Sequence, residues 1–329
     1  MDGSVNEPPI GRTIDADAPQ PVPSAHRIDG TNGRMQRFTI PGKGGHVAGL
    51  NFGRASGPID LVFLHATGFC ALTYRRLLEP LGPRRRVVAL DLRGHGRTTL
   101  PARAATLTHW YTYARDVVGA VRQLAADQPP PRLIAGHSLG GTVALLALAA
   151  EPRLAAGLVM IDPAMVPTRW RRWLLLPFAP RVLSRRLPIA RSASRRRPQF
   201  PSNEEVLASY RGRGAFRTWL PGFLEDYVED GFARRADGSV ALRCSPAWES
   251  ATFAAHRHDL RAALRALRVP ALMLVAEHGS TSAPMVPEVR ACAPAARIET
   301  IPGSTHFLPM ERPELVRERI LGLLAGRKG

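Results

Sequence analysis

A serine flanked by glycines is the first group in this sequence that could carry out chemistry. Residues 136–140 read Gly-His-Ser-Leu-Gly, at the end of the apolar run RLIAGHS and before a helical segment. Glycines two residues either side of a serine permit a strand-to-helix turn so tight that the serine backbone is strained. Ser138 is thereby exposed at the positive end of a helix, which helps to hold a developing oxyanion. The pattern predicts a nucleophilic serine.

A serine nucleophile needs a base, and His306 is the candidate. It lies in GSTHFLPMERPELV, after the last expected strand and before the last expected helix, so it should reach the same edge of the sheet as Ser138. The other histidines fit less well, because His95 belongs to a turn and His256 and His258 lie in an arginine-rich region. The alternative is that His306 is an ordinary surface histidine.

Two backbone N–H groups should stabilise the oxyanion. One belongs to Leu139, the residue after the serine, and the other to the loop HATGF (65–69), where Thr67 is the preferred donor. His65 is expected to brace this loop rather than take part in chemistry, and His137 to point away from the nucleophile. Both histidines and Phe69 are expected beside the substrate pocket.

The segments that would position these groups alternate between strand and helix signals. Strands are expected at 35–40, 46–54, 59–67, 87–92, 132–138, 157–162, 270–276 and 296–302. Helices are expected at 71–81, 109–127, 139–150 and 313–324. This alternation is typical of an α/β fold with a mostly parallel, here eight-stranded, sheet and helices on both faces.

The alternation stops within residues 163–255, where short helical pieces are broken by proline and glycine. Because this stretch lies between two strands of one sheet, it is expected to be an inserted helical cap, and residues 35–162 and 256–329 form the core. Residues 1–34 are acidic and rich in proline, so they are expected to be a loose tail that cannot bury enough surface to order itself.

Composition narrows the class of protein. The net charge is +18, but only two of the 45 basic residues are lysines, and no nucleic-acid-binding motif accompanies the arginines, so we expect no nucleic-acid partner. No apolar run is long enough to span a membrane, and the N-terminus lacks the pattern of a secretory signal. Three widely spaced cysteines fit a reducing compartment, and we expect a cytoplasmic location.

Five motifs at successive strand ends give the sequence a family resemblance. They are LHATGF (64–69), DLRGHG (91–96), GHSLGG (136–141), MIDPAM (160–165) and GSTHFLPMERP (303–313). In this order they make the chain resemble an α/β-hydrolase-fold enzyme from about Gln36 to Leu324. The resemblance implies a triad in the order serine, acid, histidine, and usually a helical cap after the sixth strand. Ser138 and His306 map onto that pattern.

The acid departs from the commoner family pattern, which places an aspartate shortly after the seventh strand, roughly as G-E-x-D. In the run AEHG the aspartate slot is occupied by Gly279. Asp162, at the end of the sixth strand, is the preferred acid, since some family members carry it there; its other role would be to cap the turn before Pro163. Glu277 is the alternative acid, and a Ser–His dyad without an acid is the third interpretation.

Residues 169–197 contain ten arginines and no acidic residue, interleaved with Trp170, Trp173 and other apolar residues. The arginines could contact a membrane surface as part of an interfacial lid, bind an anionic substrate, or form a solvated face. In each case the two tryptophans are expected to pack over the pocket of a hydrophobic substrate.

The leading hypothesis is a serine hydrolase that cleaves a carboxylic ester of a hydrophobic small molecule or lipid through an acyl-enzyme on Ser138. The same triad would serve a carbon–carbon bond hydrolase. A catalytically silent binding protein would explain the departure at Gly279. No cofactor is expected, because no metal-binding cluster is present and the stretch PGKGG (41–45) lacks the spacing of a phosphate loop.

Overall fold

The computed structural model describes residues 28–31, 35–167, 173, 176 and 178–326. Its centre is a sheet with the order β1-β2-β3-β5-β4-β6-β7-β11-β12. The strands are β1 (Ile28–Thr31), β2 (Met35–Gly42), β3 (Gly45–Gly53), β4 (Leu61–Leu64), β5 (Arg86–Leu90), β6 (Leu133–His137), β7 (Leu158–Ile161), β11 (Ala271–His278) and β12 (Arg297–Thr305). From β5 to β12 all neighbours pair in parallel, while β1, β2 and β3 are antiparallel. The eight expected strands are confirmed, and β1 adds a ninth at the edge.

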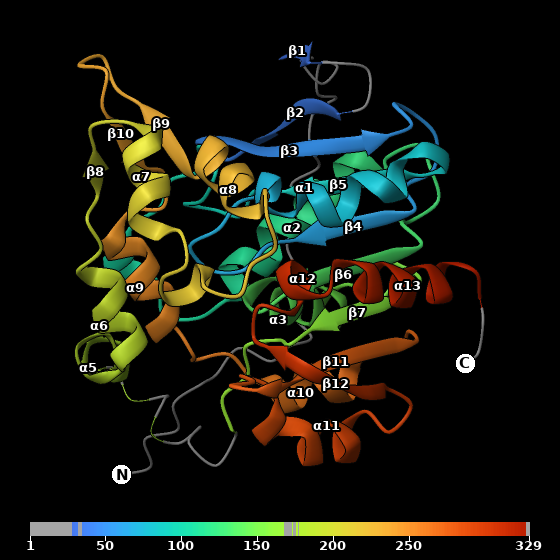
Figure 1. Ribbon diagram of the computed structural model, residues 1–329. Helices are drawn as coiled ribbons and strands as arrows, with labels where there is room; N and C mark the ends of the chain where they lie inside the picture. Colours follow the sequence, from blue (N-terminus) through green and yellow to red (C-terminus); the bar gives the residue numbers. More distant parts are fainter. Residues whose placement is uncertain (1–27, 32–34, 168–172, 174–175, 177, 327–329) are drawn as a thin grey trace.

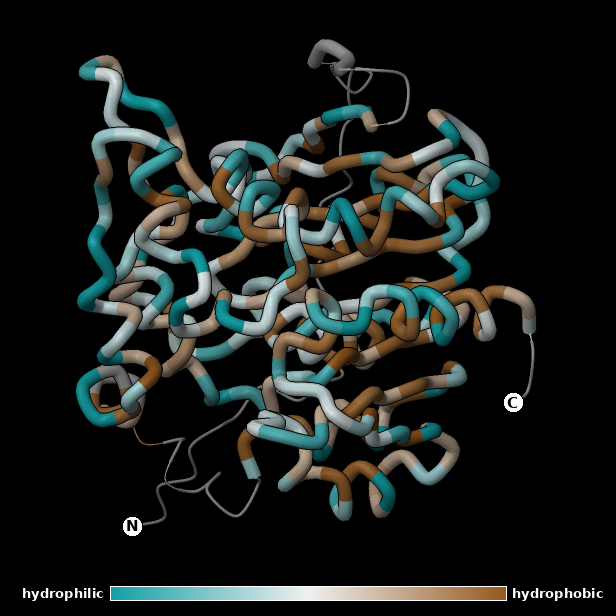
Figure 2. Tube along the Cα trace, viewed as in Figure 1, coloured by the Kyte–Doolittle hydropathy of each residue, from teal (hydrophilic) through white to brown (hydrophobic). Residues whose placement is uncertain are grey.

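Helices cover both faces of this sheet (Figure 1). One face packs against α1 (Arg75–Leu78), α12 (Leu308–Glu311) and α13 (Pro313–Leu324), and the other against α2 (Tyr111–Leu124), α3 (Leu139–Ala150), α10 (Leu260–Ala266) and α11 (Val286–Cys292). Side chains of β4 alternate between the two cores, so that Leu61 and Phe63 enter one and Val62 and Leu64 the other. A strand buried on both faces consists of a continuous apolar run, which is hydrophobic along its length in Figure 2. The strands β4 to β7 can therefore be recognised in the sequence.

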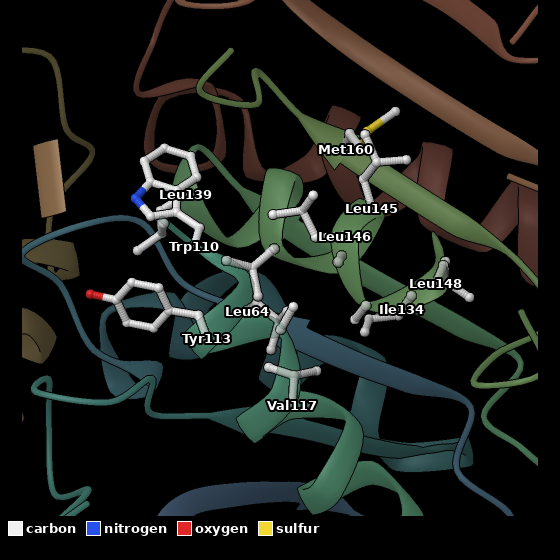
Figure 3. Close-up of a cluster of buried hydrophobic side chains, with 14 of the residues drawn as sticks. Leu64, Trp110, Tyr113, Val117, Ile134, Leu139, Leu145, Leu146, Leu148 and Met160 are labelled. Carbon is white, nitrogen blue, oxygen red and sulfur yellow. The ribbon is translucent and has the colours of Figure 1, made fainter. Parts of the chain in front are cut away.

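The core behind α3 fixes the start of that helix. Leu139, its first residue, is fully buried and belongs to the same cluster as Leu64 and Trp110 (Figure 3). Deleting a buried leucine side chain costs about 2–5 kcal/mol, so the helix start is anchored by packing as well as by backbone hydrogen bonds. The residue immediately before Leu139 is therefore held in a defined position.

The helix expected over residues 71–81 is interrupted. The chain forms η1 (Ala71–Tyr74), then α1, then a second 3₁₀ helix, η2 (Glu79–Arg84). Pro80 and Pro83 account for the change, because proline cannot donate the backbone hydrogen bond that a longer α-helix needs. In the described part of the chain, the helices are too short or too polar to cross a membrane.

Residues 163–255 leave the sheet after β7 and rejoin it before β11, and their elements gather on one side of it, at the left of Figure 1. The helices are α5 (Ala179–Arg186), α6 (Pro188–Ser194), α7 (Asn203–Tyr210), α8 (Phe223–Gly231) and α9 (Pro246–Ala254). A small antiparallel sheet joins them: β8 (Gln199–Phe200), β9 (Phe232–Arg234) and β10 (Val240–Leu242). Strands of two or three residues leave no readable alternation, so the sequence did not reveal this sheet.

Candidate active site

Ser138 occupies the turn between β6 and α3 with a strained backbone, at φ 54° and ψ −117°. The glycines around it are required by close backbone approach. A Cβ on Gly136 would lie 2.2 Å from the carbonyl carbon of Gly140, and one on Gly140 would lie 2.2 Å from the carbonyl oxygen of Leu64. The Gly-x-Ser-x-Gly spacing thus packs the turn against β4 and presents the Ser138 side chain to a cavity.

His306 lies directly after β12 and reaches Ser138. Its Nε2 is 3.1 Å from Ser138 Oγ, and its Nδ1 is 2.6 Å from Asp162 Oδ2. Because a carboxylate can only accept, Nδ1 carries the ring proton and Nε2 is left to accept the hydroxyl proton of Ser138. The structure therefore joins the three residues that the sequence favoured in one hydrogen-bonded chain.

Asp162, just after β7, is fully buried and has a φ of 38°, which is rare for a residue other than glycine. Its carboxylate also accepts hydrogen bonds from the N–H groups of Ala276 and Thr281 and from the hydroxyls of Ser280 and Ser282. Burial alone would raise the pKa of Asp162, but the interaction with His306 and these donors lower it to about 2. The small hydroxyl residues after β11 thus hold an acid that comes from β7.

Glu277, the alternative acid, lies outside this chain of hydrogen bonds. Its carboxylate is about half exposed, accepts a hydrogen bond from the Gly303 N–H at 2.8 Å, and contacts the ring of His278. Gly279, in the slot of the usual aspartate, adopts a φ of 61°. Among the described residues, the carboxylate beside Nδ1 of His306 is that of Asp162 and not that of Glu277. This geometry favours Asp162 over both Glu277 and a dyad without an acid.

Two N–H groups are left for an oxyanion. In the loop after β4, the neighbours of Thr67 are engaged: the Ala66 N–H donates to the Tyr74 hydroxyl, the Phe69 N–H to the Ala66 carbonyl, and the Gly68 N–H faces the Cys244 sulfur. Within the described residues, neither Thr67 nor Leu139 has an acceptor for its N–H. These are the two donors that the sequence selected, and Thr67 lines the same cavity as Ser138.

His65 does not line the cavity, contrary to expectation. It is fully buried; its Nδ1–H donates to the Ala66 carbonyl at 2.7 Å and its Nε2 accepts the Leu92 N–H at 2.9 Å. Both ring nitrogens are thereby committed to backbone groups, and burial holds the pKa of His65 well below its usual value. His65 braces the Thr67 loop, as its position before that loop suggested.

His137 is also absent from the cavity wall, because its ring points into the core. Its Nδ1 accepts a hydrogen bond from the Tyr74 hydroxyl, and its Nε2–H donates to the backbone carbonyl of His306, both at 2.7 Å. Burial lowers the pKa of His137 to about 3, so the ring is neutral. A neutral tautomer with both nitrogens engaged positions its neighbours and does not exchange protons.

The cavity above Ser138 has a volume of about 360 Å³ and a largely aromatic wall. Core loops contribute Phe69 and Phe307, while the insertion contributes Phe200, Phe216 and Phe253. A pocket of this size and composition suits an apolar acyl or alkyl group. Of its aromatic residues the sequence pointed to Phe69 alone, although Phe307 directly follows His306 and could have been found.

The two tryptophans expected over the pocket are not part of its described wall. Trp173 is 38% exposed and does not line the cavity, and Trp170 lies outside the described residues. The apolar wall comes instead from the later part of the insertion, where single aromatic residues in short elements show no periodic pattern. Trp170 and Trp173 lie three residues apart in the arginine-rich stretch, so they were easier to recognise in the sequence than the scattered aromatic residues that line the cavity.

Residues 61–319 match the Alpha/beta hydrolase family. The chain belongs to the alpha/beta hydrolase family. The strand order of the sheet, the turn that carries Ser138 and the position of His306 after β12 agree with this assignment.

Two curated proteins and one solved structure are similar to this chain. The chain is 39% identical to mouse (Mus musculus) protein phosphatase methylesterase 1 over 112 residues, which are 33% of this chain and 28% of that protein, so the match spans under a third of the relative's length. It is 24% identical to 2-(acetamidomethylene)succinate hydrolase of Mesorhizobium japonicum over 272 residues, 82% of this chain and 89% of the other. A crystal structure of E-2-(acetamidomethylene)succinate hydrolase superposes with a TM-score of 0.70 and 24% identity, covering 92% of this chain and 99% of that one.

Proposed function

We propose that this α/β hydrolase cleaves a carboxylic ester of a hydrophobic small molecule or lipid through an acyl-enzyme on Ser138. The observation that carries the proposal is the hydrogen-bonded chain from Ser138 through His306 to Asp162 at the base of an aromatic cavity. The N–H groups of Thr67 and Leu139 supply the second requirement, two donors for the oxyanion.

In this mechanism His306 Nε2 takes the hydroxyl proton of Ser138 as Oγ attacks the acyl carbon. The electron pair of the carbonyl moves to its oxygen, which accepts hydrogen bonds from Thr67 and Leu139. The C–O bond to the alcohol then breaks, and His306 protonates the leaving oxygen. Water, deprotonated by His306, attacks the acyl-enzyme, releasing the acid and restoring Ser138. Asp162 holds the imidazole tautomer and stabilises its charged form throughout.

The competing hypotheses have less support. A silent binding protein needs no buried carboxylate on its histidine, yet Asp162 makes that contact with four further donors holding it. A carbon–carbon hydrolase acting on a diketo acid needs cations free to bind carboxylates, whereas the arginines that line the described cavity are ion-paired. Ester chemistry also agrees with the name of the mouse relative, a methylesterase.

We further propose that α5 and α6 approach a lipid surface. Phe178 and Ile189 are about half exposed, and Arg185 and Arg186, which lie between them in the sequence, are exposed as well. Apolar side chains flanked by arginines suit a surface of anionic lipids. Co-sedimentation should show binding to phosphatidylglycerol vesicles and not to phosphatidylcholine vesicles, and Phe178→Asn should weaken it; equal retention by both kinds of vesicle would contradict charge-dependent docking.

The function is tested by hydrolysis of p-nitrophenyl esters with acyl chains of two to twelve carbons. We expect turnover by the wild-type chain, with a preference for medium chains, and its loss in Ser138→Ala. A fluorophosphonate probe should add its phosphonyl group to the tryptic peptide that contains Ser138, as seen by mass spectrometry. An inert wild-type chain that the probe leaves unlabelled would overturn the proposal.

A further inference from the structure

One wall of the aromatic cavity carries a buried ion pair. Arg196, just after α6, donates from Nη1 to Glu249 Oε2 of α9 at 2.7 Å, and both side chains line the cavity. Their side chains are only 19% and 8% exposed. Burying two charges is costly unless they are paired and hydrogen-bonded, so an ion pair in an aromatic pocket calls for an explanation.

Hydrogen bonds hold the ion pair in place, but each of the two side chains still has one polar atom without a hydrogen-bond partner. Arg196 Nη2 also donates to the hydroxyls of Tyr227 and Tyr210, at 2.8 and 3.2 Å. Within the described chain, the Nε–H of Arg196 has no acceptor and the Oε1 of Glu249 has no donor, and neither atom is fully buried. One ion pair in the cavity wall therefore carries one unused donor, on Arg196, and one unused acceptor, on Glu249.

This polar site adjoins the oxyanion loop. Gly68, which follows Thr67, has a φ of 79°, and a Cβ on it would lie 2.5 Å from Glu249 Oε1 and 3.4 Å from Arg196 Nη1. The free oxygen of Glu249 thus lies against the backbone of the loop that carries the Thr67 N–H. A group bound by the pair would belong to the same substrate whose carbonyl reaches Ser138.

Each described arginine that lines the cavity is paired with a glutamate, so the wall has no unpaired positive charge. Glu249 balances Arg196, and Arg197 at the rim pairs with Glu205 at 2.7 Å. A carboxylate would be attracted by Arg196 and repelled by Glu249 at nearly the same distance. An uncharged group that both donates and accepts would satisfy both free atoms with no charge left unpaired.

We propose that the Arg196–Glu249 pair selects substrates that carry an uncharged hydrogen-bonding group, a carboxamide or hydroxyl, and rejects those that carry a carboxylate at the same place. This inference rests on the ester hydrolysis proposed above and names its substrate class. It departs from recognition of an anionic group, which the arginine excess of the insertion suggests, because the exposed arginines of α5 and α6 do not reach the described wall.

The test uses three isosteric p-nitrophenyl esters at each of three chain lengths. For the six-carbon length these are adipamate, the adipate monoester and 6-methylheptanoate, which end in a carboxamide, a carboxylate and an isopropyl group. We expect kcat/KM of the wild-type chain to be at least tenfold higher for the carboxamide than for the carboxylate at the best length. The isopropyl ester measures the contribution of the apolar wall alone.

Two variants assign the selectivity to the pair. Glu249→Gln keeps the shape but leaves Arg196 without a counter-charge, so the carboxylate ester should gain at least tenfold relative to the carboxamide. Arg196→Gln should lower kcat/KM for the carboxamide about tenfold relative to the isopropyl ester. Arg191→Gln removes an exposed arginine of α6 and is the control; it should leave all three ratios unchanged.

A binding experiment separates this inference from the proposed function. The methyl ketones 6-oxoheptanamide, 6-oxoheptanoate and 7-methyloctan-2-one carry the same three end groups at the same distance from the carbonyl and need no turnover, so calorimetry reports the selectivity even if every ester is inert. Inert esters with selective ketone binding would overturn ester hydrolysis and support the selectivity. A wild-type preference for the carboxylate, or an equal effect of Glu249→Gln on all three ligands, would overturn the inference.

Discussion

At the scale of single residues, the carboxylate of Asp162 has a double role, as the partner of His306 and as the acceptor for the loop after β11. Replacing it with asparagine keeps the size but offers an amide that can donate to Nδ1 and stabilise the wrong tautomer. We expect Asp162→Asn to lower kcat by a factor on the order of 10³–10⁴. Steady-state hydrolysis of the best p-nitrophenyl ester checks this.

Glu277→Gln is the matched control for that prediction, because it makes the same acid-to-amide change on a neighbouring strand end. Its carboxylate contacts Gly303 and His278 and no part of the Ser138–His306 chain. We expect kcat to stay within about twofold of the wild-type value. A larger loss in Glu277→Gln than in Asp162→Asn would mean that the acid is not Asp162.

At the scale of elements, one line of hydrogen bonds ties together three loops. The Ala66 N–H donates to the Tyr74 hydroxyl, which donates to His137, which in turn donates to the carbonyl of His306. Tyr74→Phe breaks this line between the oxyanion loop and the His306 loop. We expect kcat to fall about tenfold with little change in KM, since the cavity wall is untouched.

The control for this prediction is Tyr113→Phe, which also removes a buried hydroxyl, here bonded to Thr252 and away from the three loops. Both variants should lose about 1–3 kcal/mol of unfolding free energy in urea, because each removes a hydrogen bond between buried groups. A purely structural role for Tyr74 would make the two variants equal in kcat as well. The comparison therefore separates positioning from general stability.

The serine turn makes a second prediction at this scale. Gly140→Ala would place a Cβ 2.2 Å from the Leu64 carbonyl oxygen, and backbone cannot yield as a flexible side chain can. We expect a loss of about 3 kcal/mol or more in urea unfolding. Gly119→Ala, in the interior of α2 with nothing within 4 Å of the new Cβ, should instead gain about 0.5–1 kcal/mol. Equal effects would contradict the close approach.

The elements also explain what the sequence could and could not predict. Strands such as β4 and β6 are buried on both faces, so their composition alone reveals them, and Ser138 and Asp162 were found because they follow such strands. His306 follows the edge strand β12, which is only partly buried, and was found from its place between the last strand and the last helix. The cavity wall was not found. Its aromatic residues come from short elements of the insertion whose packing depends on contacts far apart in the chain, and Arg196 looked like one of ten similar arginines.

At the scale of the whole molecule, buried histidines make the fold sensitive to acid. Burial lowers the pKa of His95 to about 4 and of His137 to about 3, and holds those of His65 and His258 well below the usual value. The unfolded chain binds these protons below about pH 6.5 and the folded chain does not, so stability falls as the pH drops from 6.5 toward 4.

Asp91 acts in the opposite direction. Burial raises its pKa to about 6, so the folded chain takes up this proton first and regains stability as the pH drops from 6 toward 4. Relative to pH 7, His95 and His137 each lower the free energy of unfolding at pH 5 by about 2 kcal/mol, and Asp91 raises it by about 1 kcal/mol. These three groups together give an expected net loss of about 3 kcal/mol.

Urea unfolding at pH 7.5 and 5.0 measures this loss. His95→Gln keeps a donor for the Arg93 carbonyl but cannot titrate, so the difference between the two pH values should shrink by about 2 kcal/mol. His278→Gln replaces an exposed histidine and should leave the difference as it is in the wild-type chain. If His95→Gln were as acid-sensitive as the wild type, burial of the neutral His95 ring would not be a source of the sensitivity, which would then lie with the other buried histidines.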